Sequence, residues 1–459
     1  MAENGVQTVV ILGLARQGKA LARYWVQRGA QVIVSDKRPA EALQADIASL
    51  GDLPIRYVLG GHPLELLDGC DLLCLSGGIP LDLPIVEEAR RRGIPLSSDA
   101  QEFLRVCPAP VVGITGSAGK TTTTALTGAL IRAAGFTTWV GGNIGNPLLD
   151  DLPAIQPTDR VVMELSSFQL DLMTLSPAIA AVLNITPNHL DRHKTMEAYI
   201  AAKANIVRHQ RPGDWAILGY DEPNARGLSA LTPARVAYFS LHHGPDVGTF
   251  LRGDVLLARW NDREGEICRR VDVPLRGAHN LQNVLAASAL ALAAGAPLEG
   301  LREVIRTFEG VPHRLEVVRR WRDVTWINDS IATAPERVLA ALRAFDEPLV
   351  LLAGGRDKQL PWADFALEAA RRVRVIITFG EAGDLIAGHL RQALATLGPQ
   401  AALETLQRVA TLDEAVQLAA QWARPGEVVL LSPGGTSFDA FQDFAARGEH
   451  FRALVLNLD

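Results

Sequence analysis

The sequence predicts an α/β protein of three domains, with a Rossmann-like N-terminal domain, a central P-loop domain and a Rossmann-like C-terminal domain. Strand-length apolar runs alternate with helical spacing along most of the chain, and two glycine-rich turns each follow such a run. At 459 residues the chain also exceeds one ordinary hydrophobic core. Proline- and glycine-bearing segments at 107–110 and 310–312 indicate boundaries, so we expect domains at 1–106, 107–311 and 312–459.

The N-terminal domain is predicted from a strand, a glycine turn, a helix and a second strand at residues 8–12, 13–18, 19–28 and 31–35. Further strands are expected near 72–75 and 94–96. Gly13, Ala15 and Gly18 nearly reproduce the dinucleotide-binding pattern, with Asp36 at its acidic position. One glycine of that pattern is missing, so the motif alone is a weak indication of a nicotinamide nucleotide.

The other two domains continue the alternation of strands and helices. In the central domain we expect strands at 111–114, 161–165 and 179–183, short strands and turns over 214–275, and a helix over 280–294. In the C-terminal domain we expect strands at 325–328, 349–353, 375–379 and 428–431, with helices between them. Side chains that follow parallel strands are the candidate functional residues, because those strand ends meet at one edge of a sheet.

Composition excludes several classes of protein. A net charge of −6 with 21% charged residues gives no reason to propose nucleic-acid or membrane-surface binding. No apolar run reaches the roughly 20 residues of a membrane span, and the N-terminus lacks the features of a signal peptide, so we expect a cytoplasmic protein. Four cysteines are too few for a disulfide framework. Only six of the 45 basic residues are lysines, which favours a specific role for some of them.

The segment 113–124, GITGSAGKTTTT, predicts a phosphate-binding loop. It follows an apolar strand and precedes an expected helix at 121–133, so its backbone N–H groups can face a phosphate at the positive end of that helix. Lys120 supplies a charge for the β- and γ-phosphates, and the Thr121 hydroxyl can bind Mg²⁺. Ile114 stands where the strict pattern has glycine. An ordinary glycine turn is the alternative, and the flanking strand and helix favour nucleotide binding.

Two further side chains follow strands near this loop. Glu164 ends an apolar strand, where a carboxylate beside a P-loop can bind Mg²⁺, although a solvated loop residue explains it equally well. His189 follows the strand at 179–183, where a structural or exposed histidine is the ordinary interpretation.

Ten ordered motifs resemble those of the Mur ligase superfamily over essentially the whole chain. They are GITGSAGKTTT, GGNIG (141–145), ELSSFQL (164–170), NITPNHLDRH (184–193), AAKANI around Lys203, HNLQN (279–283), PHRLE (312–316), NDSIATAP (328–335), GGRDK (354–358) and LSPGGTSFDAF (431–441). The ELSSFQL form is similar to that of the D-glutamate-adding branch. The resemblance implies a UDP-binding first domain, an ATPase-like second domain and a third domain that binds amino acid and nucleotide.

The resemblance also assigns roles to residues. Catalysis would involve Lys120, His189, Lys203 and Asn143. ATP would be bound by Gly116, Ser117, Gly119, Lys120, Thr121, Thr122, Asn280, Asn283, Arg314 and Asp329. Two Mg²⁺ ions would be held by Thr121, Glu164, His189 and Lys203, with Lys203 carbamylated by CO₂. That modification needs a neutral amine, which arginine does not provide. An exposed helix lysine is the alternative for Lys203.

The implied substrates are UDP-N-acetylmuramoyl-L-alanine and glutamate. The UDP-linked substrate would be bound by Arg16, Gln17, Asp36, Ser76, Gly78, Asn143 and Ser166, with Asp36 near the uracil. The family more often has proline where Gly77 stands. Glutamate would be bound by Thr333, Lys358, Ser437 and Phe444. Ile331 replaces a lysine that is frequent in the family, so a missing cation is either supplied elsewhere or marks altered specificity.

The implied reaction activates the L-alanyl carboxylate as an acyl phosphate, which the glutamate amine then attacks. D-Glutamate is favoured over L-glutamate on similarity alone, and both stay open. Another Mur or folate-type ligase, a nicotinamide-dependent dehydrogenase and a P-loop switch protein are the remaining alternatives. A dehydrogenase would have no use for the P-loop. A P-loop switch protein would have no use for the other two domains. We expect a monomer.

Overall fold

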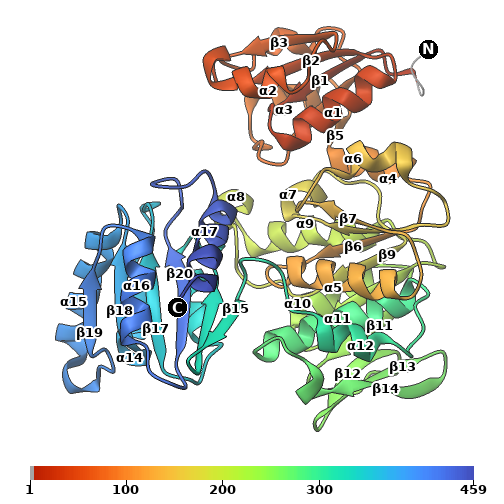
Figure 1. Ribbon diagram of the computed structural model, residues 1–459. Coiled ribbons are helices and arrows are strands. Elements are labelled where there is room, and N and C mark those ends of the chain that lie inside the picture. The colour runs from red at the N-terminus through yellow and green to blue at the C-terminus, as the bar shows by residue number, and fades with distance from the viewer. Residues whose placement is uncertain (1–4) are drawn as a thin grey trace. The chain divides into compact units, whose positions relative to one another are not determined.

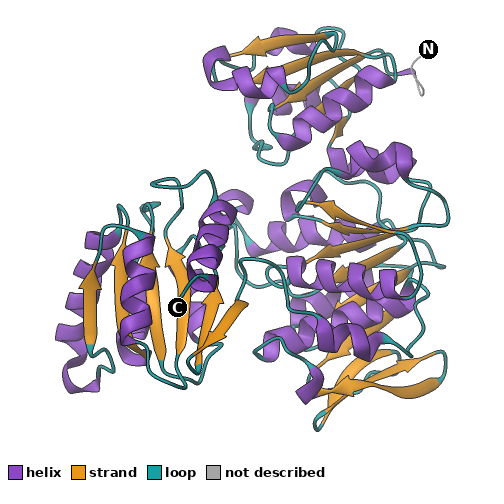
Figure 2. Ribbon diagram, in the orientation of Figure 1, coloured by secondary structure: helices purple, strands orange, loops and turns teal. Residues whose placement is uncertain are grey.

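Three separate β-sheets with flanking helices make up the protein, as seen in a computed structural model that describes residues 5–459 apart from the side chain of Asp191 (Figures 1 and 2). The chain forms two compact units: residues 5–273 with 278–307, and residues 274–277 with 308–459. The predicted three-sheet α/β class is confirmed. The domain boundaries at 106/107 and 311/312 stay predictions.

The first sheet has five parallel strands in the order β3-β2-β1-β4-β5. The strands are β1 (Thr8–Leu12), β2 (Gln31–Asp36), β3 (Ile55–Leu59), β4 (Leu72–Leu75) and β5 (Leu96–Ser97), and the helices are α1 (Arg16–Gln27), α2 (Gln44–Ala48), α3 (Pro84–Arg91) and α4 (Asp99–Val106). Helix α1 begins at Arg16, three residues before the predicted start at Lys19. The prediction was late because it relied on apolar spacing, and the polar side chains of Arg16 and Gln17 do not contribute to that spacing. A Cβ at Gly18 would lie 1.9 Å from the Gly13 carbonyl oxygen, so this turn needs glycine there.

The second sheet has nine strands in the order β14-β13-β12-β11-β10-β9-β6-β8-β7, parallel from β12 to β7 and antiparallel through β13 and β14. The strands are β6 (Val111–Thr115), β7 (Thr138–Gly142), β8 (Arg160–Glu164), β9 (Ile179–Val182), β10 (Trp215–Gly219), β11 (Arg235–Ser240), β12 (Gly248–Arg252), β13 (Val255–Trp260) and β14 (Arg263–Arg269). The helices are α5 (Lys120–Ala133), α6 (Leu148–Asp151), α7 (Ser167–Leu170), α8 (Leu190–His193), α9 (Met196–Arg208), α10 (Pro223–Gly227), α11 (Ala278–Ala293) and α12 (Leu301–Thr307). Helices α5 and α11 pack side by side (Figure 1).

The third sheet, in the second unit, has six strands in the order β15-β16-β20-β17-β18-β19, and only β15 is antiparallel to its neighbour. The strands are β15 (Glu316–Trp321), β16 (Val324–Asn328), β17 (Leu349–Gly354), β18 (Val373–Phe379), β19 (Thr405–Arg408) and β20 (Val428–Gly434). The helices are α13 (Pro335–Leu342), α14 (Ala363–Arg372), α15 (Gly383–Leu397), α16 (Leu412–Trp422) and α17 (Phe444–Leu456).

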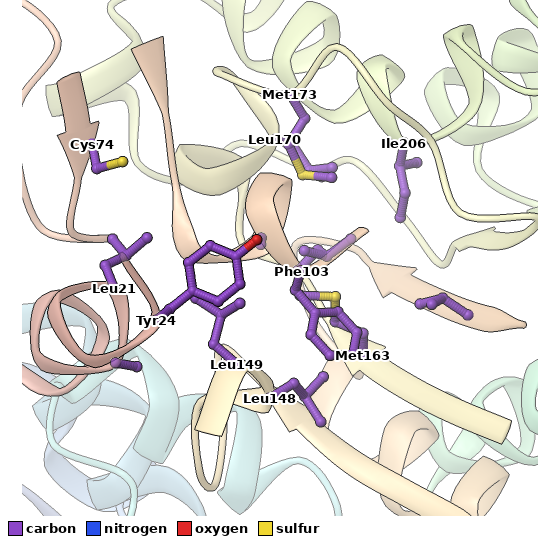
Figure 3. Packing of buried hydrophobic residues seen from close by; sticks show 14 of the residues in the cluster. Leu21, Tyr24, Cys74, Phe103, Leu148, Leu149, Met163, Leu170, Met173 and Ile206 are labelled. Carbon is purple, nitrogen blue, oxygen red and sulfur yellow. The ribbon is translucent and has the colours of Figure 1, made fainter. Parts of the chain in front are cut away.

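One cluster of buried side chains continues from the first sheet into the second. Figure 3 shows Leu21 and Tyr24 of α1 beside Leu149 of α6, with Phe103 of α4 near Met163 of β8. Burial of such side chains stabilises a fold by roughly 1.5–3 kcal/mol each. The free thiols of Cys70, Cys74 and Cys268 are buried, and that of Cys107 is partly buried. Among the described residues, no helix is long and apolar enough to cross a membrane.

Candidate active site

A glycine turn links β6, an interior strand of the second sheet, to α5. Gly119 is the N-cap of α5 with φ +84°, a conformation that favours glycine. A Cβ at Gly119 would lie 2.3 Å from Oδ1 of Asn283 in α11. Lys120 begins the helix, one residue earlier than predicted, and its Nζ donates to the Gly116 carbonyl at 2.8 Å. The turn therefore presents backbone N–H groups, a helix N-terminus and an ammonium together, which suits a phosphate.

The loop after the adjacent strand β9 holds this turn in place. The Asn184 carbonyl accepts from the Ser117 amide and its Oδ1 accepts from the Ala118 amide, both at 2.9 Å. The Ser117 hydroxyl donates to the Thr186 carbonyl at 2.9 Å and lies 2.9 Å from the Tyr199 hydroxyl. Sequence reasoning did not single out Asn184 or Tyr199. Asn184 stands inside a motif that was recognised, whereas Tyr199 has no sequence signal.

Glu164 brings together three of the predicted site residues. It ends β8 with only 2% of its surface exposed. One carboxylate oxygen accepts from the Thr121 hydroxyl at 2.9 Å, and the other accepts from Nδ2 of Asn143 at 2.8 Å. Both donors are neutral, and among the described residues no basic side chain lies within ion-pair distance of this carboxylate. A buried negative charge with neutral partners is suited to a bound cation.

Lys203, on α9, lies on the other side of the turn and is 1% exposed. Its Nζ donates to Oγ1 of Thr115 at 3.2 Å and to the Gly116 carbonyl at 3.0 Å. Burial lowers the pKa of Lys203 well below its usual value, and the nearby Lys120 lowers it further while Glu164 opposes the change. The structure thus holds an amine in conditions that favour the neutral form, and the alternative of an exposed helix lysine is wrong.

His189 lies at the N-cap of α8 with φ 54°, and its ring packs edge-on against Phe168 with 5.2 Å between centroids. Among the described residues, no three His, Cys, Asp or Glu side chains are placed to hold a metal ion as a group. The residues that fit a cation are Thr121 and Glu164.

Asn283 of α11 lies beside the start of α5. It donates through Nδ2 to Oδ1 of Asn280 at 3.0 Å and accepts from the Thr123 hydroxyl at 3.3 Å.

The N-terminal turn has a different electrostatic environment. Asp36 ends β2 and accepts from the Leu14 amide at 2.8 Å, from the Arg38 amide at 2.9 Å and from the Arg38 guanidinium at 2.9 Å. Burial alone would raise the pKa of Asp36, but the hydrogen bonds from Arg38 and Leu14 lower it to about 2. The Gln17 side-chain oxygen accepts from the Gly77 amide at 2.8 Å, and Arg16 donates to the Asn143 carbonyl at 3.3 Å.

A cavity of about 580 Å³ lies between the loop after β4 and the segment around α7 and α8, within the first unit. Of the predicted UDP-site residues, Ser76 lines it, and Gly78 and Ser166 do not. Ser166 instead forms a capping box with Gln169. Charged side chains of both signs line the cavity, namely Asp82, Glu87, Arg90, Asp171, Arg192 and Lys194.

Thr333, Ser437 and Lys358, three of the predicted glutamate residues, lie in loops after the adjacent parallel strands β16, β20 and β17 of the second unit. The fourth, Phe444, is the first residue of α17. Lys358 Nζ donates to Oγ1 of Thr333 at 3.3 Å. Ser437 is buried, and the Phe444 carbonyl accepts from the Ser330 hydroxyl at 2.8 Å. The structure therefore gathers all four predicted residues at one edge of this sheet.

Arg447 of α17 holds two of these loops and was not predicted. It is fully buried and donates to the carbonyls of Ser330, Gly435 and Thr436 at 2.9–3.2 Å, and to the Ser330 hydroxyl at 3.0 Å. Burial lowers the pKa of Arg447 to about 10. As one of many arginines, it carries no sequence signal.

Asp329 follows β16 and is also buried. It accepts from the Ser432 hydroxyl at 2.8 Å and from the Leu315 amide at 3.3 Å. Burial raises the pKa of Asp329 to about 7 despite these hydrogen bonds. Arg314 and Asp329 lie in the second unit, and the other predicted ATP-binding residues lie in the first.

Comparison with known proteins gives consistent results along the chain. Residues 7–98 match the Mur ligase MurD-like N-terminal domain, residues 114–291 the Mur ligase middle domain, and residues 313–435 the Mur ligase glutamate ligase domain. The UDP-N-acetylmuramoylalanine–D-glutamate ligase of Symbiobacterium thermophilum is 44% identical over 98% of both chains. The enzyme of the same name from Roseiflexus is 41% identical over 97% of both.

Solved structures share the fold at lower identity. The UDP-N-acetylmuramate-alanine ligase MurC of Thermotoga maritima aligns over 98% of this chain and 99% of its own, with a TM-score of 0.59 and 19% identity. A pseudomurein peptide ligase from Methanothermus fervidus aligns over 99% of this chain and 100% of its own, with a TM-score of 0.55 and 18% identity.

Proposed function

The chain belongs to the Mur ligase family, and on that premise we propose that it joins D-glutamate to the L-alanyl carboxylate of UDP-N-acetylmuramoyl-L-alanine, using ATP, in peptidoglycan precursor synthesis. The observation that supports this most strongly is the arrangement around the glycine turn before α5. A phosphate-binding helix start, a buried carboxylate with neutral partners and a buried amine converge there. We place the reaction in the cytoplasm, carried out by a monomer of three domains.

The reaction needs activation, because a carboxylate oxygen is a poor leaving group. The L-alanyl carboxylate attacks the γ-phosphorus of ATP, which forms an acyl phosphate and releases ADP. The glutamate amine then attacks the acyl carbon, and phosphate leaves from the tetrahedral intermediate as the amine loses a proton. The Lys120 ammonium and the N–H groups at the start of α5, from Gly119 to Thr121, stabilise the phosphate charge, so positioning and electrostatics supply most of the rate enhancement.

Magnesium suits the residues at this site. The Glu164 carboxylate and the Thr121 hydroxyl, which lie 2.9 Å apart, are oxygen ligands of the kind that Mg²⁺ prefers. A bound Mg²⁺ would add positive charge beside the transferred phosphoryl group. His189, Asn143 and the two asparagines of α11 complete the set that we assign to metal, substrate and nucleotide.

We further propose that Lys203 carries a carbamate. Its neutral amine would attack CO₂, a C–N bond would form, and loss of a proton would leave an anion for a second Mg²⁺. Protein loaded with ¹³C-bicarbonate is expected to show a carbamate carbon signal that is absent from Lys203→Ala. An identical signal in Lys203→Ala would reject this assignment, since another amine would then carry the label.

The function is tested by phosphate release from ATP and Mg²⁺ with purified protein. Release is expected only when UDP-N-acetylmuramoyl-L-alanine and D-glutamate are both present, with a product heavier by one glutamyl residue. Lys120→Ala is the matched inactive control, and Lys19→Ala, which removes an ion pair with Asp46 outside the turn, is the active one. Release with L-glutamate instead would reject the D-specificity. Release that requires neither substrate would reject the ligase.

A further inference from the structure

Two cations flank the loop after β16 in the second unit without a carboxylate partner. Lys358 donates to Oγ1 of Thr333 at 3.3 Å, and Nη1 of Arg337 donates to the Ile331 carbonyl at 3.2 Å. Arg337 is exposed and lies in the first turn of α13. Among the described residues, no carboxylate lies within ion-pair distance of either cation.

Several other arginines of this unit are paired with carboxylates, whereas Arg319 and Arg447, like Arg337, donate to carbonyls. Arg356 pairs with Glu381 at 2.7 Å, Arg374 pairs with Glu427, and Arg343, at the other end of α13, lies 4.0 Å from Glu368. An unpaired guanidinium that is tied to a loop carbonyl keeps its other N–H groups available for an anion.

Arg337 and Lys358 also influence each other. Burial lowers the pKa of Lys358 first, and the positive charges of Arg337 and Arg447 lower it further. Like charges held this close repel, and a bound dianion would relieve the repulsion. The side chains at 331–334 are isoleucine, alanine, threonine and alanine and offer no further charge. Asp329, at the start of the loop, is buried, and the charge of Arg337 acts on it without a direct ion pair.

We propose that Arg337 binds one of the two carboxylates of the incoming glutamate while Lys358 binds the other. This inference rests on the proposed function and names a substrate-binding residue for it. Glutamate brings two carboxylates to the site and must present an uncharged amine for attack, so two cations match its charge. A guanidinium can bind a carboxylate through two parallel hydrogen bonds, which also orients the substrate. The cation missing at Ile331 is thereby supplied from α13.

Steady-state kinetics of Arg337→Gln test the proposal. Loss of a charged hydrogen bond to a carboxylate is expected to raise KM for D-glutamate roughly 10- to 100-fold. The KM values for ATP and for the UDP-linked substrate are expected to stay within about twofold. Arg343→Gln is the matched control, because it removes an arginine from the same helix away from the loop. Arg337→Lys keeps the charge without the fork and is expected to be intermediate.

A second variant separates binding from folding. Ile331→Lys in the Arg337→Gln background returns a cation to the loop and is expected to recover much of the glutamate KM. An unchanged glutamate KM in Arg337→Gln would overturn the inference, as would an equal rise in all three KM values, which indicates a general defect. If the wild-type protein itself makes no glutamyl product, the proposed function fails instead, so the two failures are distinguishable.

Discussion

The turn after β1 and the turn after β6 occupy the same place in two different sheets. Each is glycine-rich, follows an interior parallel strand and precedes a helix, α1 or α5. In each sheet an adjacent strand ends in a buried acid, Asp36 at the end of β2 and Glu164 at the end of β8. Backbone geometry alone would assign the two turns the same chemistry.

The neighbours of the two acids differ. Asp36 is neutralised by the Arg38 guanidinium at 2.9 Å and accepts backbone N–H groups from its own turn. Among the described residues, the Glu164 carboxylate accepts from the Thr121 hydroxyl and the Asn143 side-chain amide. One carboxylate is therefore bound to its own turn, and the other has only neutral donors among the described side chains and suits a cation. The difference depends on side chains beside the strand ends, and the fold of the strands does not determine it.

The largest expected effect is on activity, from Glu164→Gln. A glutamine can accept from Asn143 and donate to the Thr121 hydroxyl, so the change removes charge and preserves shape. We expect turnover to fall roughly 100-fold and the Mg²⁺ concentration for half-maximal rate to rise. Thermal stability should change little, because the glutamine keeps both hydrogen bonds. Phosphate release across a Mg²⁺ titration measures this, and an unaltered Mg²⁺ dependence would contradict the assignment.

Asp36→Asn, in contrast to Glu164→Gln, is expected to lower the free energy of unfolding of the protein. The variant leaves Arg38 without its carboxylate, at a cost of about 1–2 kcal/mol at neutral pH. The Asp36 pKa is about 2 in the fold against a usual 3.8, so its contribution is present above pH about 4 and is lost as the pH falls through 2. Urea unfolding of both proteins at several pH values checks this. A stability difference that persists at pH 2 would show that the charge is not its cause.

Asp329→Asn extends the comparison to the third sheet, with the smallest expected effect. Burial raises the Asp329 pKa to about 7 from 3.8, so the folded protein binds the proton more tightly and wild-type stability falls as the pH rises from about 4 to 7. The asparagine variant lacks this loss. Its stability relative to wild type should therefore increase by about 1 kcal/mol between pH 5 and pH 6. Urea unfolding of both proteins at pH 5 and pH 6 measures this. A difference in unfolding free energy between variant and wild type that is the same at both pH values would contradict the prediction.

Much of the site was predictable because its residues are tied to strand ends. Apolar runs locate β6, β8 and β16 to within a residue, and Lys120, Glu164 and Asp329 stand at or just after those runs. Sequence spacing did not predict the roles of Tyr199, Arg447 and Arg337. They act from helices across a loop, and helical periodicity shows which face is apolar without showing which loop lies opposite.

The sequence by itself determined the α/β class, the glycine turns and the identity of the groups that can bind phosphate, carboxylate and cation. Local backbone preferences and the order of motifs carry that information. Only the tertiary structure decided that Lys203 is buried against Thr115, that Glu164 has neutral partners while Asp36 has a guanidinium, and that Arg337 reaches the Ile331 carbonyl. These outcomes depend on burial and on neighbours distant in sequence, and those two quantities set the charge state of a side chain.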